Sequence, residues 1–284
     1  MIEHTIPEAV RPLPLEKYLR RAWPMTPGHV LRDALKKRDV RVNGAKAEGG
    51  AKVAGGDRLA LYVDGRFFDM APEVLWTDER LIVAIKPQGL PVDADQDGIG
   101  ADTLLLRLRT RWPGARLCHR LDAATGGIVL AANDDRVWDQ AFEAFKCHGV
   151  RKRYHAVALG DFDRREGTLR AWLRKDAASA TVHVLHREAP GAKPIETRFR
   201  VGEPAGDGAW HVALEPVTGR THQLRAHMAD YGHPLLGDDK YGDREANRRH
   251  PGRLRLWHER LTIPEDSPLA DYRGRTFEAP APEW

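Results

Sequence analysis

Three separated segments of the chain carry polar side chains that could act together on one substrate. The first is a loop that contains Arg120 and Asp122, ends in Gly126 and Gly127, and leads into the apolar run at residues 128–131. Functional residues tend to lie on a loop that a buried strand holds rigidly. Taken alone, however, a loop aspartate such as Asp122 most often accepts hydrogen bonds from nearby backbone amides.

The second segment could bind a base and its phosphate. The alternation in residues 151–160 predicts a β-strand with Lys152 and Tyr154 on one face. On the wall of a cleft, the ring could stack on a base while the cation holds a phosphate. An isolated Lys-x-Tyr pattern also fits a core tyrosine on an edge strand.

The third segment, residues 218–227, is rich in polar side chains at a predicted helix start. A strand should end at Pro216, and the turn Thr218-Gly219 should lead into the helix. Backbone N–H groups at the start of a helix favour anions. The segment therefore predicts an anion-facing surface, which carries Arg220, His222, Gln223, Arg225 and His227.

Other elements must hold these segments in place. Residues 81–85 form an apolar run that predicts a buried strand, and the breakers at residues 86–89 end it. Asp102 is a suitable N-cap for a helix through residues 104–108. A further helix should follow residues 133–134 and cover the sheet. Its expected buried face consists of Val137, Ala141, Phe142 and Phe145.

The first 63 residues predict a small α+β module. Amphipathic helices are expected at residues 14–23 and 28–37, each with an apolar stripe opposite its basic residues. The spacing then changes to that of strands at residues 40–42. Asn43-Gly44 is suited to a tight hairpin turn, and residues 59–63 alternate as another strand.

The excess of positive charge lies in this module. The net charge is +4; residues 1–64 contain 12 Lys/Arg and 8 Asp/Glu, and the remaining residues contain 33 of each. A basic module before a neutral body indicates an arm that binds polyanions, because phosphate contacts supply affinity without reading sequence. An ordinary solvated surface would explain the charge equally well.

The composition predicts a folded protein outside membranes. Hydrophobic residues make up 42% of the chain, enough for a sizeable core, yet no stretch approaches the roughly 20 uninterrupted apolar residues of a spanning helix. The first residues lack the pattern of a secretory signal. Two cysteines, Cys118 and Cys147, cannot form a disulfide framework. We therefore expect a cytoplasmic protein.

Two known families resemble these patterns. Residues 12–63 resemble the alpha-L RNA-binding motif, first described in a small-subunit ribosomal protein, at Arg41-Val42-Asn43-Gly44 and Gly56-Asp57. The chain from Leu81 onward resembles the RluA-type family of RNA pseudouridine synthases, whose members commonly carry that motif at the front. Four blocks match in order: Ile85-Lys86-Pro87-x-Gly89, His119-Arg120-Leu121-Asp122-x-x-Thr125-x-Gly127, Lys152-x-Tyr154-x-Ala156-x-Ala158-x-Gly160, and Thr218-Gly219-Arg220-Thr221-His222-Gln223-Leu224-Arg225-x-His227.

The chain departs from the family pattern at three places. Gly126 stands where the family commonly has serine, and Leu256-Trp257-His258 stands where it usually has Leu-His-Ala. In the front motif, Arg38-Asp39 replaces the usual glycine before the first strand.

The resemblance implies an α+β fold with two domains. Residues 1–63 would form the alpha-L RNA-binding domain and residues 64–72 a linker. Residues 73–284 would form the catalytic domain, a mixed and largely antiparallel sheet with flanking helices and a central cleft.

It also implies the chemistry. Pseudouridine formation breaks the bond from uracil nitrogen to ribose, turns the base and rejoins it through carbon. The reaction needs an ionised carboxylate but no cofactor or metal, which fits a chain without a phosphate-cradling loop or dinucleotide fingerprint. The spacings of His222, His227, Cys118-His119 and Cys147-His148 match no standard zinc pattern.

By resemblance, Asp122 is the catalytic carboxylate, Arg225 pairs with it, and Tyr154 packs on the target base and assists removal of the proton from carbon 5. A neighbouring guanidinium commonly lowers a carboxylate pKa by about 1 to 3 units. The sequence leaves open whether Asp122 attacks the sugar, attacks the base or removes a ribose proton. Arg120 is the candidate to fill the space left by a flipped-out uridine. The expected substrate-binding residues are Arg120, Lys152, Arg220, His222, Gln223 and Leu224.

The resulting hypothesis is an isomerase that acts on structured RNA, with large-subunit ribosomal RNA as the first expected substrate and transfer RNA as the second. One alternative is a non-catalytic RNA-binding or ribosome-assembly factor. Another is a base-flipping hydrolase or deaminase, which would need a metal or a water-activating pair. RNA is the expected partner, and a monomer is the default oligomeric state.

Overall fold

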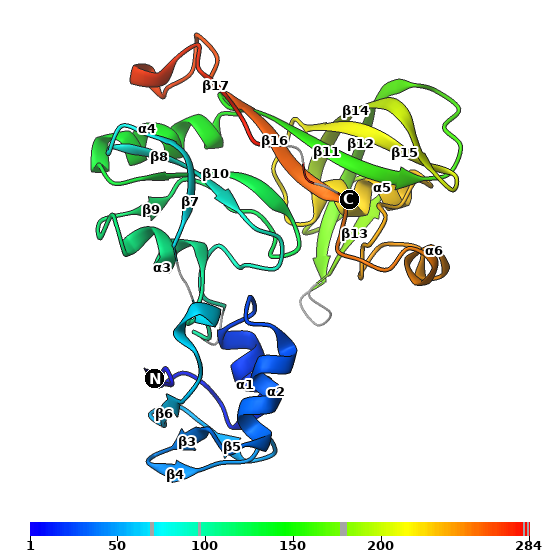
Figure 1. The fold of residues 1–284 in the computed structure, drawn as a ribbon. Coiled ribbons are helices and arrows are strands. Elements are labelled where there is room, and N and C mark those ends of the chain that lie inside the picture. Colours follow the sequence, from blue (N-terminus) through cyan, green and yellow to red (C-terminus); the bar gives the residue numbers. More distant parts are fainter. Residues whose placement is uncertain (69–70, 96–97, 177–180, 281, 283) are drawn as a thin grey trace. The chain divides into compact units, whose positions relative to one another are not determined.

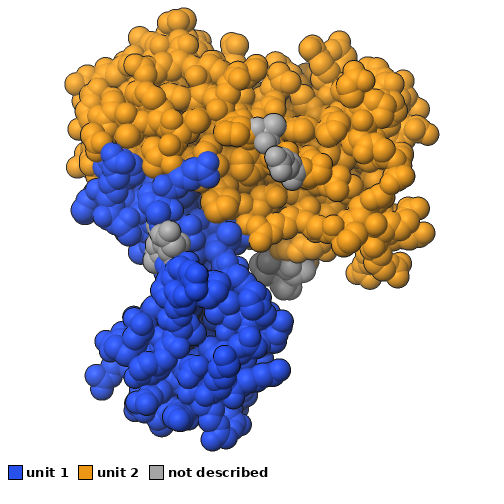
Figure 2. Space-filling view, viewed as in Figure 1, with its two compact units in different colours: residues 1–73, 89–115 blue, residues 74–88, 116–284 orange. Residues whose placement is uncertain are grey.

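The protein forms two compact units in a computed structural model that describes residues 1–284 except 69–70, 96–97, 177–180, 281 and 283. Unit 1 contains residues 1–73 and 89–115, and unit 2 contains residues 74–88 and 116–284 (Figure 2). The sequence predicted boundaries at residues 63 and 73. It did not predict that residues 89–115 belong to unit 1. The assignment of domain functions stays a prediction.

Unit 1 combines short strands with three α-helices (Figure 1). Its main sheet has the strand order β1-β6-β3-β4, and β2 pairs separately with β5. The two predicted N-terminal helices and the hairpin turn at Asn43-Gly44 are present. The elements are β1 (Ile2–Thr5), β2 (Leu13–Pro14), α1 (Leu15–Ala22), α2 (Gly28–Lys36), β3 (Val40–Val42), β4 (Ala45–Lys46), β5 (Lys52–Val53), β6 (Arg58–Leu61), the 3-10 helix η1 (Gly65–Phe68) and α3 (Leu104–Arg109).

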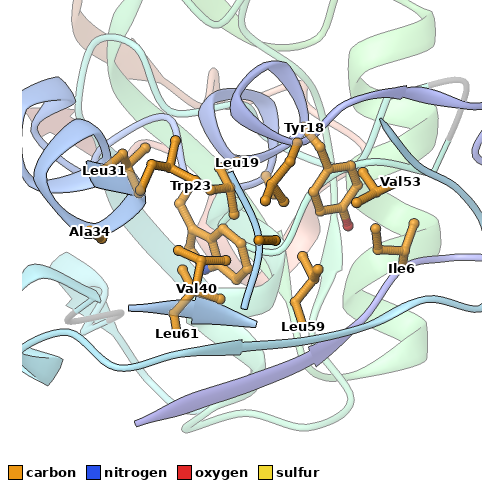
Figure 3. Packing of buried hydrophobic residues seen from close by; sticks show 14 of the residues in the cluster. Ile6, Tyr18, Leu19, Trp23, Leu31, Ala34, Val40, Val53, Leu59 and Leu61 are labelled. Atoms are coloured by element: carbon orange, nitrogen blue, oxygen red, sulfur yellow. The ribbon is translucent and has the colours of Figure 1, made fainter. Parts of the chain in front are cut away.

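Helix α1 and the sheet enclose the apolar core of unit 1. Tyr18 and Leu19 of α1 are fully buried and lie over Leu59 and Leu61 of β6 (Figure 3). Ile99, from the returning segment, belongs to the same core. This segment is also tied to α1, because the backbone amide of Asp102 donates to the Ala22 carbonyl at 2.9 Å.

The predicted N-cap at Asp102 is wrong by one residue. Helix α3 is capped by Thr103, whose hydroxyl accepts from the Leu106 amide. Asp102 instead accepts two hydrogen bonds, of 2.7 and 2.9 Å, from the guanidinium of Arg107. Both residues can cap a helix, so the sequence pattern does not separate these neighbours.

Unit 2 is built on one large sheet. Its main strand order is β13-β12-β14-β15-β11-β16-β10-β8-β7, and β9 and β17 pair with β10 and β16. Among the strand pairs with a described register, β10 and β16 are parallel, and the neighbouring pairs β8–β10, β11–β16, β11–β15, β14–β15 and β12–β14 are antiparallel. The elements are β7 (Glu73–Thr77), β8 (Leu81–Lys86), β9 (Arg116–Leu117), β10 (Gly126–Ala132), α4 (Asp135–Lys146), β11 (Arg151–Leu159), β12 (Glu166–Asp176), β13 (Thr181–Leu185), β14 (Lys193–Gly206), β15 (Ala209–Pro216), α5 (Gln223–Asp230), α6 (Arg244–Arg249), β16 (Leu256–Thr262), the 3-10 helix η2 (Ala270–Tyr272) and β17 (Thr276–Glu278).

Two helices cover different parts of this sheet. Helix α4 packs near β10, and α5 packs on β13, β14 and β15 (Figure 1). Val137, Ala141 and Ala144 form the buried face of α4, but Phe142 is 47% exposed, so its predicted place on that face is wrong. The predicted fold class, α+β with a mixed and mostly antiparallel sheet, is confirmed. No helix in the described part of the chain combines the length and hydropathy that a membrane crossing requires.

Candidate active site

The loop that carries Asp122 connects β9 to β10 and is anchored from the end of β8. A turn closes the loop, because the Thr125 amide donates to the Asp122 carbonyl at 3.0 Å. The ammonium group of Lys86 donates to the Ala123 carbonyl at 3.0 Å, and the amide of Gln88 donates to the Ala124 carbonyl at 3.1 Å. Lys86 is fully buried, and burial lowers its pKa to about 7. The Lys-Pro-x-Gly block thus holds the loop while the Asp122 side chain stays 26% exposed.

Arg225 brings a buried positive charge to this carboxylate. Its Nη1 lies 3.7 Å from Oδ2 of Asp122. Its Nε and Nη2 donate to the carboxylate of Asp238 at 2.7 Å each, and Nη2 also donates to Asp239 at 2.8 Å. Burial opposes the charge of Arg225, but the Asp238 hydrogen bond and charge outweigh it and raise the pKa of Arg225. The buried pair therefore stays ionised and keeps Nη1 directed at Asp122.

Tyr154 lies on β11 and is almost completely buried. Burial raises the pKa of its hydroxyl, and the charge of Asp122 raises it further. The phenol therefore keeps its proton at neutral pH. His258, its direct partner in the neighbouring strand β16, stacks on the ring with centroids 4.6 Å apart and planes inclined by 14°. This stacking fixes the plane of the Tyr154 ring.

Lys152 shares the sheet face of Tyr154, as the alternation predicted. Burial lowers the pKa of its ammonium group. A β carbon placed on Gly219 would lie 3.4 Å from the Lys152 nitrogen, so the turn before α5 lies against this cation. The Lys152 ammonium group also lies 5.8 Å from the ring centre of Phe145.

Helix α5 begins later than the sequence pattern indicated. It starts at Gln223, so Arg220 and His222 precede the helix, and His222 is its N-cap residue. Gln223 is buried and its side chain is fully engaged inside the protein: its oxygen accepts from Arg220 and Thr218, and its nitrogen donates to Glu196 and Thr197. The amide group of Gln223 therefore stabilises the turn. Leu224 is also buried.

The remaining candidates differ in exposure. Arg120 and Arg220 are exposed, whereas His222 is half-buried, with Nε2 3.8 Å from Oδ2 of Asp122. Burial lowers the pKa of His222, although the charge of Asp122 opposes this. The structure thus brings Asp122, His222 and Arg225 together.

Four residues of this region were not among the predicted site residues. Lys86 lies in a block that matches the family and Asp238 lies in a loop after α5, but the local sequence at either position gives no sign of its buried partners. Tyr241 contacts His222, with 2.9 Å between its hydroxyl and Nδ1. His258 lies where the chain departs from the family pattern, and that departure was the available signal.

The departures at Gly126 and Trp257 are linked by packing. A β carbon at Gly126 would overlap the indole ring of Trp257, which occupies that space. The absence of a side chain at Gly126 therefore makes room for the tryptophan of β16. His258 then faces Tyr154 from the same strand.

A hollow of about 520 Å³ lies on the opposite face of the sheet from Tyr154. Its lining includes Arg153, Arg198 and Arg200, and Arg153 precedes Tyr154 in β11 and therefore points to the other face. The predicted central cleft stays a prediction. Among the described residues, no group of three or more His, Cys, Asp or Glu side chains could hold a metal ion.

Comparisons with known proteins identify the family of the chain. Residues 80–230 match the family model described as RNA pseudouridylate synthase. Ribosomal large subunit pseudouridine synthase C of Rickettsia conorii is 31% identical over 256 residues, which cover 81% of this chain and 82% of the relative. Dual-specificity RNA pseudouridine synthase RluA of Escherichia coli K12 is 34% identical over 208 residues, or 73% of this chain and 92% of that protein.

A solved structure is also similar. Human RNA Pseudouridylate Synthase Domain Containing 1 aligns with a TM-score of 0.62 and 29% identity, covering 75% of this chain and 84% of that chain. Residues 80–230, which match the family model, contain the Asp122 loop, β11 and α5. The chain belongs to the RluA-type family of RNA pseudouridine synthases.

Proposed function

We propose that this isomerase uses Asp122 to convert specific uridines of large-subunit ribosomal RNA to pseudouridine. The observation that carries the proposal is the position of the Asp122 carboxylate, 3.7 Å from a guanidinium that two further carboxylates hold in place. The positive charge of Arg225 therefore lies close to the carboxylate of Asp122. An ionised carboxylate can act as a nucleophile or as a base, and each of the three routes to pseudouridine starts from this form.

The reaction rearranges one nucleotide without a net redox change. The bond between uracil N1 and ribose C1′ breaks, the base turns, and a bond forms between C5 and C1′. The C5 hydrogen leaves as a proton and N1 takes up a proton, so the product is an isomer of uridine. We propose that Tyr154 packs on the turning base. Because its pKa is raised by burial, we expect its phenol to act first through packing and hydrogen bonding. To remove the C5 proton, Tyr154 would have to lose its own proton when RNA binds, or another group would have to accept the C5 proton.

Cations around Asp122 would bind the RNA backbone. Lys152 lies on the face of Tyr154, and Arg120 and Arg220 are exposed on the loops before β10 and α5. We infer that Arg120 fills the space of the flipped uridine, since a target inside a helix is not accessible to the carboxylate. His222, Gln223 and Leu224 would act less directly, because Gln223 and Leu224 are buried.

We propose that the N-terminal part of unit 1 binds RNA without sequence specificity. Its helix α2 ends in Lys36 and is followed by Lys37, both exposed. Replacing both with glutamine should weaken RNA binding and reduce its dependence on salt, because fewer counterions are released. The catalytic step on saturating RNA should be unchanged. A double variant that binds RNA as tightly as the unmodified protein at every salt concentration would contradict this role.

The choice of RNA is supported by the relatives. The Rickettsia conorii protein is named for the large ribosomal subunit, and the Escherichia coli RluA protein is named as dual-specificity. Pseudouridine should therefore be mapped across all RNAs of cells that lack the gene, complemented with either the unmodified protein or Asp122→Asn. We expect large-subunit sites to disappear and to return only with the unmodified protein. Loss confined to transfer RNA would identify a different substrate, and no change at any site would contradict the proposal.

We also propose a monomer in the cytoplasm. The pairing of Asp122 with Arg225 within one chain supports a site that needs no second copy. Light scattering of the purified protein with and without RNA would test the oligomeric state.

A further inference from the structure

His222 is held in an unusual backbone conformation directly before α5. Its φ is 53°, in the left-handed region that residues other than glycine rarely adopt. Its carbonyl accepts the first hydrogen bond of the helix, from the Ala226 amide at 2.9 Å. Such strain persists where the surrounding structure requires one orientation of a residue, and it is often found at functional sites.

The hydroxyl of Tyr241 lies within hydrogen-bond distance of Nδ1 of His222. The Val182 amide donates to the Tyr241 oxygen at 2.8 Å, and a backbone amide can only donate. The tyrosine proton is therefore available for Nδ1 of His222, 2.9 Å away. Nδ1 then accepts, and a neutral imidazole must carry its own proton on Nε2.

The other ring nitrogen of His222, Nε2, faces the carboxylate of Asp122. Nε2 of His222 lies 3.8 Å from Oδ2 of Asp122, the oxygen that Nη1 of Arg225 approaches to 3.7 Å. Two nitrogen atoms therefore lie close to Oδ2, and Oδ1 is the other oxygen of this carboxylate. Hydrogen bonds in catalytic sites are often long without substrate and shorten in the reacting complex.

Tyr241 contacts the second donor as well. The guanidinium carbon of Arg225 lies 5.4 Å from the centre of the Tyr241 ring. The Tyr241 amide also donates to the Asp238 carboxylate at 3.0 Å, and this carboxylate binds Arg225. One tyrosine is thus in contact with both side chains that face Asp122.

We propose that Tyr241 is a positioning residue that holds His222 as the Nε2–H tautomer, and that this N–H donates to Oδ2 of Asp122 in the reacting complex. The inference rests on the proposed role of Asp122 and assigns His222 a role toward the carboxylate rather than toward the RNA. It leaves Oδ1 as the oxygen that reacts with ribose or base.

Four full-length variants test the proposal. Tyr241→Phe keeps the ring but removes the hydroxyl. His222→Leu removes both nitrogens, and His222→Gln restores one N–H donor. Tyr272→Phe is the matched control, because it also removes a buried hydroxyl, one that donates to Asp78 at 2.9 Å.

The readouts are the single-turnover rate on saturating RNA, the RNA dissociation constant and the nitrogen NMR shifts of His222. We expect the proton on Nε2 in the unmodified protein and a mixture of tautomers in Tyr241→Phe. The rate should fall roughly 10-fold in Tyr241→Phe and roughly 10- to 100-fold in His222→Leu, the range for a lost hydrogen bond to a charged group. His222→Gln should recover part of the loss. RNA affinity should stay within about twofold in all of them, and Tyr272→Phe should keep its rate.

Several results would overturn the proposal. These are a proton on Nδ1 of His222 in the unmodified protein, an unchanged rate in Tyr241→Phe, or equal rates in His222→Gln and His222→Leu. If Tyr241→Phe does not fold, the comparison of the two His222 variants still decides. An active Asp122→Asn variant would show that the proposed function itself is wrong. An inactive Asp122→Asn variant beside fully active Tyr241 and His222 variants would overturn this inference alone.

Discussion

Replacing His258 with phenylalanine should make the fold less sensitive to acid. His258 is fully buried, its Nδ1 donates to the Ile128 carbonyl at 2.7 Å, and its ring stacks on Tyr154. Burial lowers the pKa of His258 from 6.5 to about 3, so the folded protein holds the neutral ring. A phenylalanine can keep the stacking but cannot take up a proton.

The magnitude follows from the difference between the folded and unfolded states. In the unfolded chain the imidazole takes up a proton near its ordinary pKa of 6.5. The neutral, buried ring therefore contributes fully above that pH, and its contribution is lost as the pH falls toward about 3. A pH of about 5 lies about 1.5 units below the pKa of the imidazole in the unfolded chain, so proton binding stabilises the unfolded state at this pH. This corresponds to about 2 kcal/mol at 1.36 kcal/mol per unit.

Urea unfolding at about pH 7.5 and about pH 5, followed by tryptophan fluorescence, measures this contribution. The free energy of unfolding should be lower at about pH 5 than at about pH 7.5 in the unmodified protein. In His258→Phe this loss should be smaller by about 2 kcal/mol. His29→Gln is the control, because His29 is exposed, and it should show the same fall as the unmodified protein. An equal fall in all three proteins would refute the reasoning.

The other predictions concern buried contacts near the site. Asp238→Ala should lower the free energy of unfolding by about 3 to 5 kcal/mol, because the guanidinium of Arg225 loses its buried partner and keeps only carboxylates that are more exposed. Asp239→Ala, whose carboxylate is 76% exposed, should cost less than about 1 kcal/mol in the same urea titration. Equal losses of the free energy of unfolding in the two variants would contradict the claim that Asp238 is the main partner of Arg225. Gly126→Ser should lower stability by about 1 to 3 kcal/mol because it overlaps Trp257. Adding Trp257→His should recover part of this loss in a double-mutant cycle, and strictly additive effects would contradict the packing link.

The sequence could predict the elements that carry the proposed site residues, because the apolar run, the alternation and the turn are local patterns. Asp122 lies before β10 and Tyr154 on β11, as the apolar run and the alternation indicated. Arg225 lies on a helix that begins after the predicted turn. The predicted start at Arg220 was too early, since the left-handed conformation of His222 depends on contacts from distant segments.

Long-range partners could not be predicted in the same way. The Asp238 carboxylate binds Arg225 from a loop beyond α5, and Lys86 reaches Ala123 from another strand. No local spacing encodes such contacts. The return of residues 89–115 into unit 1 was missed for the same reason, because Ile99 packs on residues far away in sequence.

The most direct test of the central claim is the loss of the C5 hydrogen from uridine. Large-subunit ribosomal RNA from cells that lack the gene, labelled with tritium at C5 of uridine, should be incubated with purified protein. We predict that the unmodified protein releases tritium to water, and that Asp122→Asn binds the same RNA but releases none. Release by Asp122→Asn at the rate of the unmodified protein would contradict the account.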